Sequence, residues 1–136
     1  MTCPRNTNFR DFRGLHGYYP SISKPMNAAS DIQIVLCTVP DQETGGQIAD
    51  RLVEYRLAAC VNLIAGLESI YSWKGEIRRD SECLLMIKGL RSDYEQLERT
   101  LRELHPYELP EIIAVPVSSG LAEYLAWVRN IKNEAT

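Results

Sequence analysis

Residues 59–88 read ACVNLIAGLESIYSWKGEIRRDSECLLMIK, and this stretch decides the fold. Two segments with alternating apolar and polar side chains flank Lys74-Gly75, whose glycine suits the tight turn of a β-hairpin. Ala65-Gly66 interrupts the first segment and predicts a bulge or bend there. Each arm has about 13 to 15 residues and would reach roughly 45 Å at 3.3 Å per residue.

Arms of this length should project from the rest of the molecule. A folded domain of about 106 residues has a radius of gyration near 13 Å. Projecting strands leave open edges that need a partner. We therefore expect a homo-oligomer in which each hairpin covers the sheet of a neighbour.

The chain before the hairpin predicts a strand followed by a helix. Residues 32–38 form a short, β-branched apolar run, as in a buried strand. Asp41 can cap the following helix, in which Ile48, Leu52 and Tyr55 fall on one face.

The chain after the hairpin predicts a helix, a strand and a second helix. Ser92 and Glu95 have the S-x-x-E spacing of a capping box, and apolar residues follow at steps of three and four as far as Leu104. Residues 111–117 predict a strand in which Pro116 indicates an end or an edge position. The last helix, residues 120–130, is expected to bury Leu121, Tyr124, Leu125 and Val128.

The predicted element order is β-α-β-β-α-β-α, a split βαβ arrangement with one added helix. This order predicts an α+β ferredoxin-like sandwich. In that topology the first and last strands are antiparallel neighbours. Cys37, at the end of the first strand, should therefore lie close to His105, in the loop that leads to the last strand.

The composition is that of one soluble globular domain. The chain has 136 residues, of which 45% are hydrophobic and 24% charged, with a formal net charge of -3. Four basic side chains stand against Asp11 in residues 1–30, so the body is more acidic than the whole chain. An acidic body argues against nucleic acid as a partner.

Residues 1–30 predict a flexible extension, because they show no helical or strand period and hold three of the seven prolines. The folded domain is expected to comprise residues 31–136. The change in character is abrupt after Met26, and we hypothesise that translation can begin there.

The cysteines and the hydropathy indicate a cytoplasmic protein. No apolar run approaches the roughly 20 residues that span a bilayer, and no secretory leader is recognisable. There is no CxxC pair and no zinc-finger spacing among the cysteines, as expected for free thiols in a reducing compartment. The four positions are Cys3, Cys37, Cys60 and Cys83.

Residues 105–111, HPYELPE, form a short loop with an unusual density of functional groups. Pro106 and Pro110 bias the residues before them toward extended conformations, so the loop should be stiff. Cys37 and His105 together would suit a soft or borderline metal such as copper or zinc. The alternative is that Cys37 is a small buried side chain and that His105 is hydrogen-bonded to backbone.

Catalysis has little support in the sequence. A nucleophilic Cys37 would need a lowered pKa and a third group to orient His105 as its base. No glycine-rich turn or oxyanion hole accompanies the pair, and no phosphate-cradling loop is present. We expect a protein without enzymatic activity.

The hairpin carries further binding candidates near its turn. Tyr71 and Trp73 share one face of the first arm, where they either bind a ligand or pack at a subunit contact. Lys88 ends the second arm and is either solvated or paired with an acid such as Glu82 or Glu108.

Five motifs together resemble the CutA family of divalent-cation tolerance proteins. They cover about residues 31–132 and stand in the order of the family. The motifs are Val35-Leu36-Cys37-Thr38-Val39-Pro40-Asp41, Leu57-Ala58-Ala59-Cys60-Val61-Asn62, Ser69-Ile70-Tyr71-Ser72-Trp73-Lys74-Gly75, the loop of residues 105–111, and Tyr124-Leu125-Ala126-Trp127.

The resemblance implies a homotrimer of ferredoxin-like subunits with interlocking hairpins, and a link to copper and other divalent metal ions. It also implies a copper site made of the first-strand cysteine and two adjacent histidines before Pro-Tyr. Cys37 and His105 match two of these ligands, whereas Leu104 stands in place of the other histidine. A leucine offers no ligand atom, so the copper site is expected to be weak or to need another group.

Two classes of function follow. The first is a metal-binding tolerance protein that uses Cys37 and His105. The second is a trimeric signalling or small-molecule module, similar in outline to PII-type proteins, that binds its ligand in clefts between subunits. The cleft candidates are Asn62, Trp73, Lys88, Tyr107 and Glu108.

Overall fold

The computed structural model describes residues 31–133 and shows a four-stranded antiparallel sheet. The predicted extension, residues 1–30, and the alternative start at Met26 lie outside the described residues. The strands are β1 (Ile32–Val39), β2 (Cys60–Trp73), β3 (Glu76–Leu90) and β4 (Ile113–Pro116), in the spatial order β2-β3-β1-β4. This is the predicted α+β ferredoxin-like topology.

The first and last strands are antiparallel neighbours, as the sequence predicts. Leu36 of β1 is in register with Ile113 of β4 on one side and with Met86 of β3 on the other. The end of β1 therefore faces the chain that enters β4. This places the segment around Cys37 beside the loop of residues 105–111.

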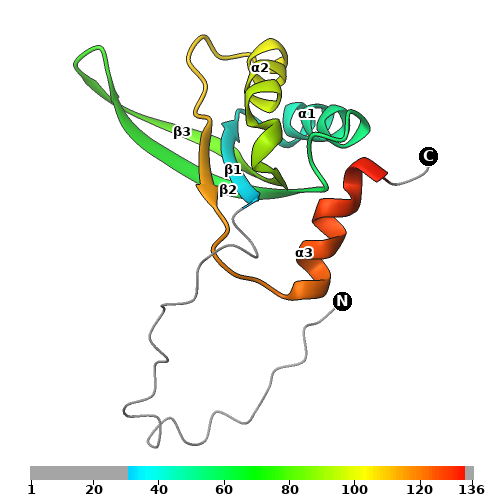
Figure 1. Ribbon diagram of the computed structural model, residues 1–136. Helices are drawn as coiled ribbons and strands as arrows, with labels where there is room; N and C mark the ends of the chain where they lie inside the picture. Colours follow the sequence, from blue (N-terminus) through cyan, green and yellow to red (C-terminus); the bar gives the residue numbers. More distant parts are fainter. Residues whose placement is uncertain (1–30, 134–136) are drawn as a thin grey trace, which may run out of the picture.

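Two helices cover one face of the sheet (Figure 1). They are α1 (Gln42–Glu54) and α2 (Tyr94–Leu104). Asp41 caps α1 as predicted, because its side chain accepts a hydrogen bond of 2.7 Å from the Thr44 backbone nitrogen. Between helices and sheet lies the main core, whose fully buried members include Val35, Cys37, Val39, Leu52, Leu85, Ile87 and Leu101.

The start of α2 differs from the prediction. A 3₁₀ turn, Arg91–Asp93, precedes the helix and places Ser92 inside the turn. Asp93 is the residue at the cap position, and it makes no side-chain capping hydrogen bond. The predicted capping box is therefore wrong, since Ser92 stands one residue too early to cap the helix.

The C-terminal helix α3 (Ala122–Arg129) is followed by a 3₁₀ turn, Asn130–Asn133, and forms a second small core. This core comprises Ile32, Ala59, Leu125, Val128 and Ile131. Leu125 and Val128 are buried as predicted. The prediction is wrong for Leu121, which is 71% exposed, and for Tyr124, which is 39% exposed.

The long hairpin projects from the body of the molecule (Figure 1). The β2 and β3 strands contain 14 and 15 residues and are joined by Lys74 and Gly75, both with positive φ. Two successive positive φ values match a type I′ turn, which suits the twist of a hairpin. The register shifts between Ile64 and Leu67 around Gly66, whose φ is 81°, so the predicted bulge is confirmed.

The sheet face opposite α1 and α2 is apolar and only partly covered. Residues in register point to the same face of a sheet, and Leu36, Met86 and Ile113 form one such row. Ile64, Ile113 and Val115 are each 45–51% exposed. The β4 strand is shorter than predicted, and it ends at Pro116 on the edge of the sheet as expected.

Candidate functional site

His105 ends α2 and begins the loop that the sequence singles out. Its backbone is extended, with φ of -79° and ψ of 134°, because Pro106 disfavours a helical conformation in the residue before it. Its backbone nitrogen still donates to the Leu101 carbonyl oxygen at 2.9 Å. The helix thus fixes the position of the imidazole.

Both ring nitrogens of His105 are hydrogen-bonded to backbone. Nε2 lies 2.7 Å from the Thr38 carbonyl oxygen, and Nδ1 accepts from the Tyr107 backbone nitrogen at 3.1 Å. Because a carbonyl oxygen can only accept and an N–H can only donate, this pattern corresponds to a neutral ring protonated at Nε2. His105 is 7% exposed, and its ring centroid lies 4.7 Å from that of Tyr107.

Cys37 meets His105 at the same carbonyl oxygen. Its Sγ donates to the Thr38 oxygen at 3.8 Å, so the predicted proximity of thiol and imidazole is confirmed. Burial, followed by the negative charges of Glu111 and Glu82, raises the pKa of the Cys37 thiol to about 12. A nucleophilic cysteine needs the opposite shift.

The described part of the chain holds no complete metal site. Within residues 31–133, no group of three or more His, Cys, Asp or Glu side chains could hold a metal ion. Leu104, which stands where the resemblance implies a second histidine, is 39% exposed and lines a surface beside Thr44 and Gln47 of α1. Cys37 and His105 therefore form a pair of candidate ligands without a third.

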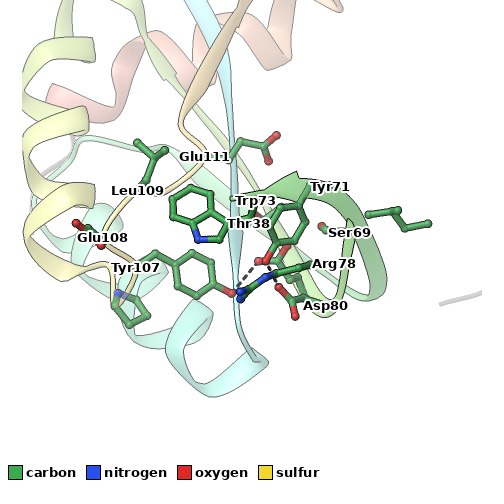
Figure 2. Close-up of a pocket in the computed structure, with 13 residues that line it drawn as sticks. Thr38, Ser69, Tyr71, Trp73, Arg78, Asp80, Tyr107, Glu108, Leu109 and Glu111 are labelled. Carbon is green, nitrogen blue, oxygen red and sulfur yellow. Dashed lines mark hydrogen bonds between the residues drawn. The ribbon is translucent and has the colours of Figure 1, made fainter. Parts of the chain in front are cut away.

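A cavity of about 650 Å³ lies between the hairpin and the loop of residues 105–111 (Figure 2). Its wall combines aromatic rings with carboxylates. The lining residues are Thr38, Ser69, Ile70, Tyr71, Trp73, Arg78, Asp80, Glu82, Pro106, Tyr107, Glu108, Leu109 and Glu111. We call this cavity the hairpin cleft.

Two phenols of the hairpin cleft donate to carboxylates. Tyr107 Oη donates to Glu82 Oε2 at 2.8 Å, and Tyr71 Oη donates to Asp80 Oδ2. Burial and the Glu82 carboxylate raise the pKa of Tyr107. The hydrogen bond to Asp80 is the main cause that raises the pKa of Tyr71. Both phenols therefore stay protonated at neutral pH.

The structure brings three of the five cleft candidates together. Trp73, Tyr107 and Glu108 line the hairpin cleft, whereas Asn62 and Lys88 do not. Lys88 is in register with Cys60 on β2, and its Nζ lies 5.8 Å from the Tyr124 ring centroid.

The ion pair considered for Lys88 is not found. Within residues 31–133, Lys88 makes no ion pair with Glu82 or Glu108. Lys88 lies near the end of β3, whereas Glu82 lies in the middle of that strand.

Comparison with known proteins decides the family. The family model of the CutA1 divalent ion tolerance protein matches residues 33–131. The chain belongs to the CutA1 family.

Three relatives show how far the likeness to CutA extends. The divalent-cation tolerance protein CutA of Thermus thermophilus is 48% identical over 97 residues, which are 71% of this chain and 94% of that protein. The chloroplastic protein CutA of Arabidopsis thaliana is 43% identical over 97 residues, 71% of this chain and 53% of that protein. The solved structure described as the PII-like protein CutA from Nostoc sp. PCC 7120 in apo form has a TM-score of 0.67 and 42% identity, and it covers 73% of this chain and 95% of that one.

Sequence reasoning missed part of the CutA hairpin cleft. Arg78, Asp80 and Glu82 occupy alternate positions of β3, and Glu111 ends the loop. The signal was present, because residues that alternate along β3 face the side of the hairpin that carries Tyr71 and Trp73. Counting cross-strand pairs outward from the Lys74-Gly75 turn identifies the β3 residues on this side of the hairpin. No helix within residues 31–133 is long and apolar enough to cross a membrane.

Proposed function

We propose that this chain is a non-enzymatic divalent-metal tolerance protein that binds metal ions, copper among them, as a homotrimer. One observation supports the metal site above the others. Cys37 Sγ and His105 Nε2 both point at the Thr38 carbonyl oxygen, so a sulfur and an imidazole nitrogen share one small space. That donor pair suits copper better than it suits calcium or magnesium.

Metal binding requires a local rearrangement at this pair. The thiol must lose its proton, and the His105 ring must turn away from the Thr38 oxygen before Nε2 can coordinate. Glu82 and Glu111 are the charged groups that act on the Cys37 thiol, and they are the candidates for further oxygen ligands. Residues of a neighbouring subunit are the other source of ligands.

A copper(I) titration of the reduced full-length protein tests the site. We expect one copper ion per chain or fewer, lost in both Cys37→Ser and His105→Ala. Cys60→Ser is the matched control, because this cysteine lies at the start of β2, in register with Lys88 rather than with Leu85, the partner of Cys37, and should leave binding unchanged. Unchanged stoichiometric binding in the first two variants removes the site.

The homotrimer is supported by the part of the sheet that the described chain leaves open. The row of Leu36, Met86 and Ile113 is covered by neither α1 nor α2, and the edges β2 and β4 are free within residues 31–133. Apolar sheet faces and open edges are covered in stable proteins. Light scattering of the purified protein should give three times the chain mass, and a monomeric mass contradicts the assembly.

A second function is favoured by the hairpin cleft. A volume of about 650 Å³ with aromatic and charged walls falls within the range of small-molecule sites. The description of the Nostoc relative as PII-like points in the same direction. We therefore propose, as the alternative, a signalling or small-molecule-binding module. Saturable binding in the hairpin cleft that is independent of copper and of Cys37 distinguishes it from the metal function.

We further propose that the protein works in the reducing cytoplasm. Cys37, Cys60 and Cys83 are all free thiols, as is usual for proteins of that compartment. Fractionation of the native cells tests this location, and recovery of the protein in another compartment contradicts it.

A further inference from the structure

We propose that the hairpin cleft binds a small organic cation, an ammonium or methylated ammonium group held between aromatic rings and carboxylates. This inference rests on the small-molecule function proposed above and names its ligand class. It is independent of the copper pair, because neither Cys37 nor His105 lines the hairpin cleft.

The charge of the hairpin cleft is the first argument. Four carboxylates line it, against the single basic side chain of Arg78. Within residues 31–133, none of these four carboxylates is in an ion pair. Arg78 Nη2 lies 3.9 Å from Glu76 Oε2, and Glu76 does not line the cleft. The four carboxylates are those of Asp80, Glu82, Glu108 and Glu111. An unneutralised excess of negative charge attracts a cation and repels a phosphate or a carboxylate ligand.

The hydrogen-bonding capacity of the hairpin cleft is the second argument. The phenolic protons of Tyr71 and Tyr107 are already donated to Asp80 and Glu82. Each carboxylate still has lone pairs to offer, because an ionised carboxylate accepts up to about four hydrogen bonds. The hydrogen-bonding groups that remain free in the cleft are therefore mainly acceptors. A ligand rich in N–H donors can bond to them.

The aromatic rings are the third argument. Figure 2 shows the rings of Tyr107, Trp73 and Tyr71 next to one another, with Arg78 and Asp80 close to the phenols. The faces of such rings attract ammonium groups, and tryptophan does so most strongly. Aromatic rings beside carboxylates are surroundings that suit ammonium and methylated ammonium groups.

The chain itself shows one such contact. Lys74 Nζ lies 5.8 Å from the centroid of the Trp73 ring. This alkylammonium belongs to the hairpin turn and is not a lining residue of the cleft. It shows that the indole is accessible to a cation, and it would compete with a bound ligand for the same ring. Lys74→Gln should therefore leave binding unchanged or strengthen it.

The electrostatic field at neighbouring groups agrees with this ligand class. Burial is the main cause that raises the pKa of both Tyr107 and Cys37. The charges of Glu82 and Asp80 add to the rise at Tyr107, and those of Glu111 and Glu82 add to the rise at Cys37. These added charge effects indicate a negative potential on both sides of the loop. A cleft for nucleotide phosphates would instead present several arginine or lysine side chains.

Fluorescence of the full-length protein tests the proposal directly. The chain has two tryptophans, so Trp127→Phe on α3 leaves Trp73 as the only reporter. Choline serves as the cationic probe and 3,3-dimethylbutan-1-ol as its uncharged analogue of the same shape; spermidine and ATP complete the set. We expect saturable quenching by choline or spermidine, and binding of the neutral analogue weaker by about tenfold or more.

Two charge-neutralising variants locate the ligand. Asp80→Asn and Glu82→Gln keep the shape and the acceptor for the tyrosine, and each should weaken cation binding by about threefold to tenfold. Glu103→Gln is the matched control, because it removes the same charge from an exposed position of α2 outside the cleft. A loss of affinity equal to that in the control variant contradicts binding in the hairpin cleft.

The remaining outcomes distinguish a failure of the cation proposal from a failure of the small-molecule function on which it rests. Equal affinity for choline and its neutral analogue overturns the cation class, and so does saturable binding of ATP alone. Both results preserve a small-molecule cleft. No saturable binding of any of the four probes at millimolar concentration overturns the cation proposal and removes the support for the small-molecule function, while leaving the copper titration unaffected.

Discussion

Tyr107 Oη donates a hydrogen bond of 2.8 Å to Glu82 Oε2 and thereby joins the loop of residues 105–111 to strand β3. Glu82 is 8% exposed, so it is a buried acidic residue. The same tyrosine fixes Nδ1 of His105 through its backbone nitrogen. One residue therefore connects the candidate metal pair with the hairpin cleft.

Tyr107→Phe should destabilise the fold by about 1–3 kcal/mol, because it leaves the buried Glu82 carboxylate without its donor. Urea unfolding followed by circular dichroism measures the change in the free energy of unfolding. Tyr71→Phe is the matched control at an exposed phenol, and it should change stability less. Tyr107→Phe should destabilise the Glu82→Gln protein less than it destabilises the native protein. An equal loss of unfolding free energy in the two proteins contradicts an interaction between Tyr107 and Glu82.

Stability should decrease between about pH 9 and pH 12 because of Cys37. Its pKa rises from an ordinary value near 9 to about 12 on folding. In this interval the unfolded chain has released the thiol proton and the folded chain has kept it, so rising pH favours unfolding. The loss at pH 11 is about 3 kcal/mol at most.

Cys37→Ala isolates this contribution from the other groups that titrate in the same range. The free energy of unfolding of the two proteins is measured at pH 8 and at pH 11. The advantage of the native protein over Cys37→Ala should shrink between these values. A constant difference means that the thiol is not strongly perturbed.

Two glycines with opposite surroundings test the packing of the fold. A Cβ at Gly89 would lie 2.7 Å from the Leu57 carbonyl oxygen, whereas a Cβ at Gly46 in α1 meets nothing within 4 Å. Gly89→Ala should therefore destabilise by about 1–3 kcal/mol through a backbone clash. Gly46→Ala should stabilise by up to about 1 kcal/mol through helix propensity. The melting temperatures of the two variants test both expectations. An unchanged melting temperature for Gly89→Ala would falsify the close approach of β3 to the segment before β2.

The fold was accessible from sequence because its signals are local and agree with one another. The alternation on either side of Lys74-Gly75 predicts the hairpin, and Asp41 predicts the start of α1; both are observed. The capping box failed because Ser92 and Glu95 have the right spacing in the wrong local conformation. A pattern of two residues cannot distinguish a 3₁₀ turn from the first turn of a helix.

The sequence predicted only those parts of the site whose residues the strand topology brings together. Antiparallel pairing of β1 with β4 brings Cys37 to His105, and the ferredoxin-like order predicts that pairing. The shared Thr38 oxygen and the raised pKa of Cys37 depend on side-chain directions and burial, which spacing does not give. The sequence left Lys88 either solvated or paired with an acid, and the separation of Lys88 from Glu82 along β3 leaves the first alternative.

The open sheet face gives the last prediction. Ile113 is 51% exposed on β4 and in register with Leu36, which is in turn paired with Met86. If the proposed trimer buries this row, Ile113→Lys places a charge in an apolar interface, and an unpaired buried charge is strongly unfavourable. Light scattering at micromolar concentration should then show a lower mass, while the circular dichroism spectrum stays unchanged.

Val53→Lys provides the matched control, because Val53 is 42% exposed on the outer side of α1, away from this face. It introduces the same charge at a similar exposure and should leave the mass unchanged. A mass unaffected by both variants means that the trimer is held by the hairpin and its edge rather than by the sheet face. A mass lowered equally by both contradicts an interface on the sheet, since a charge on the helical side should not reach it.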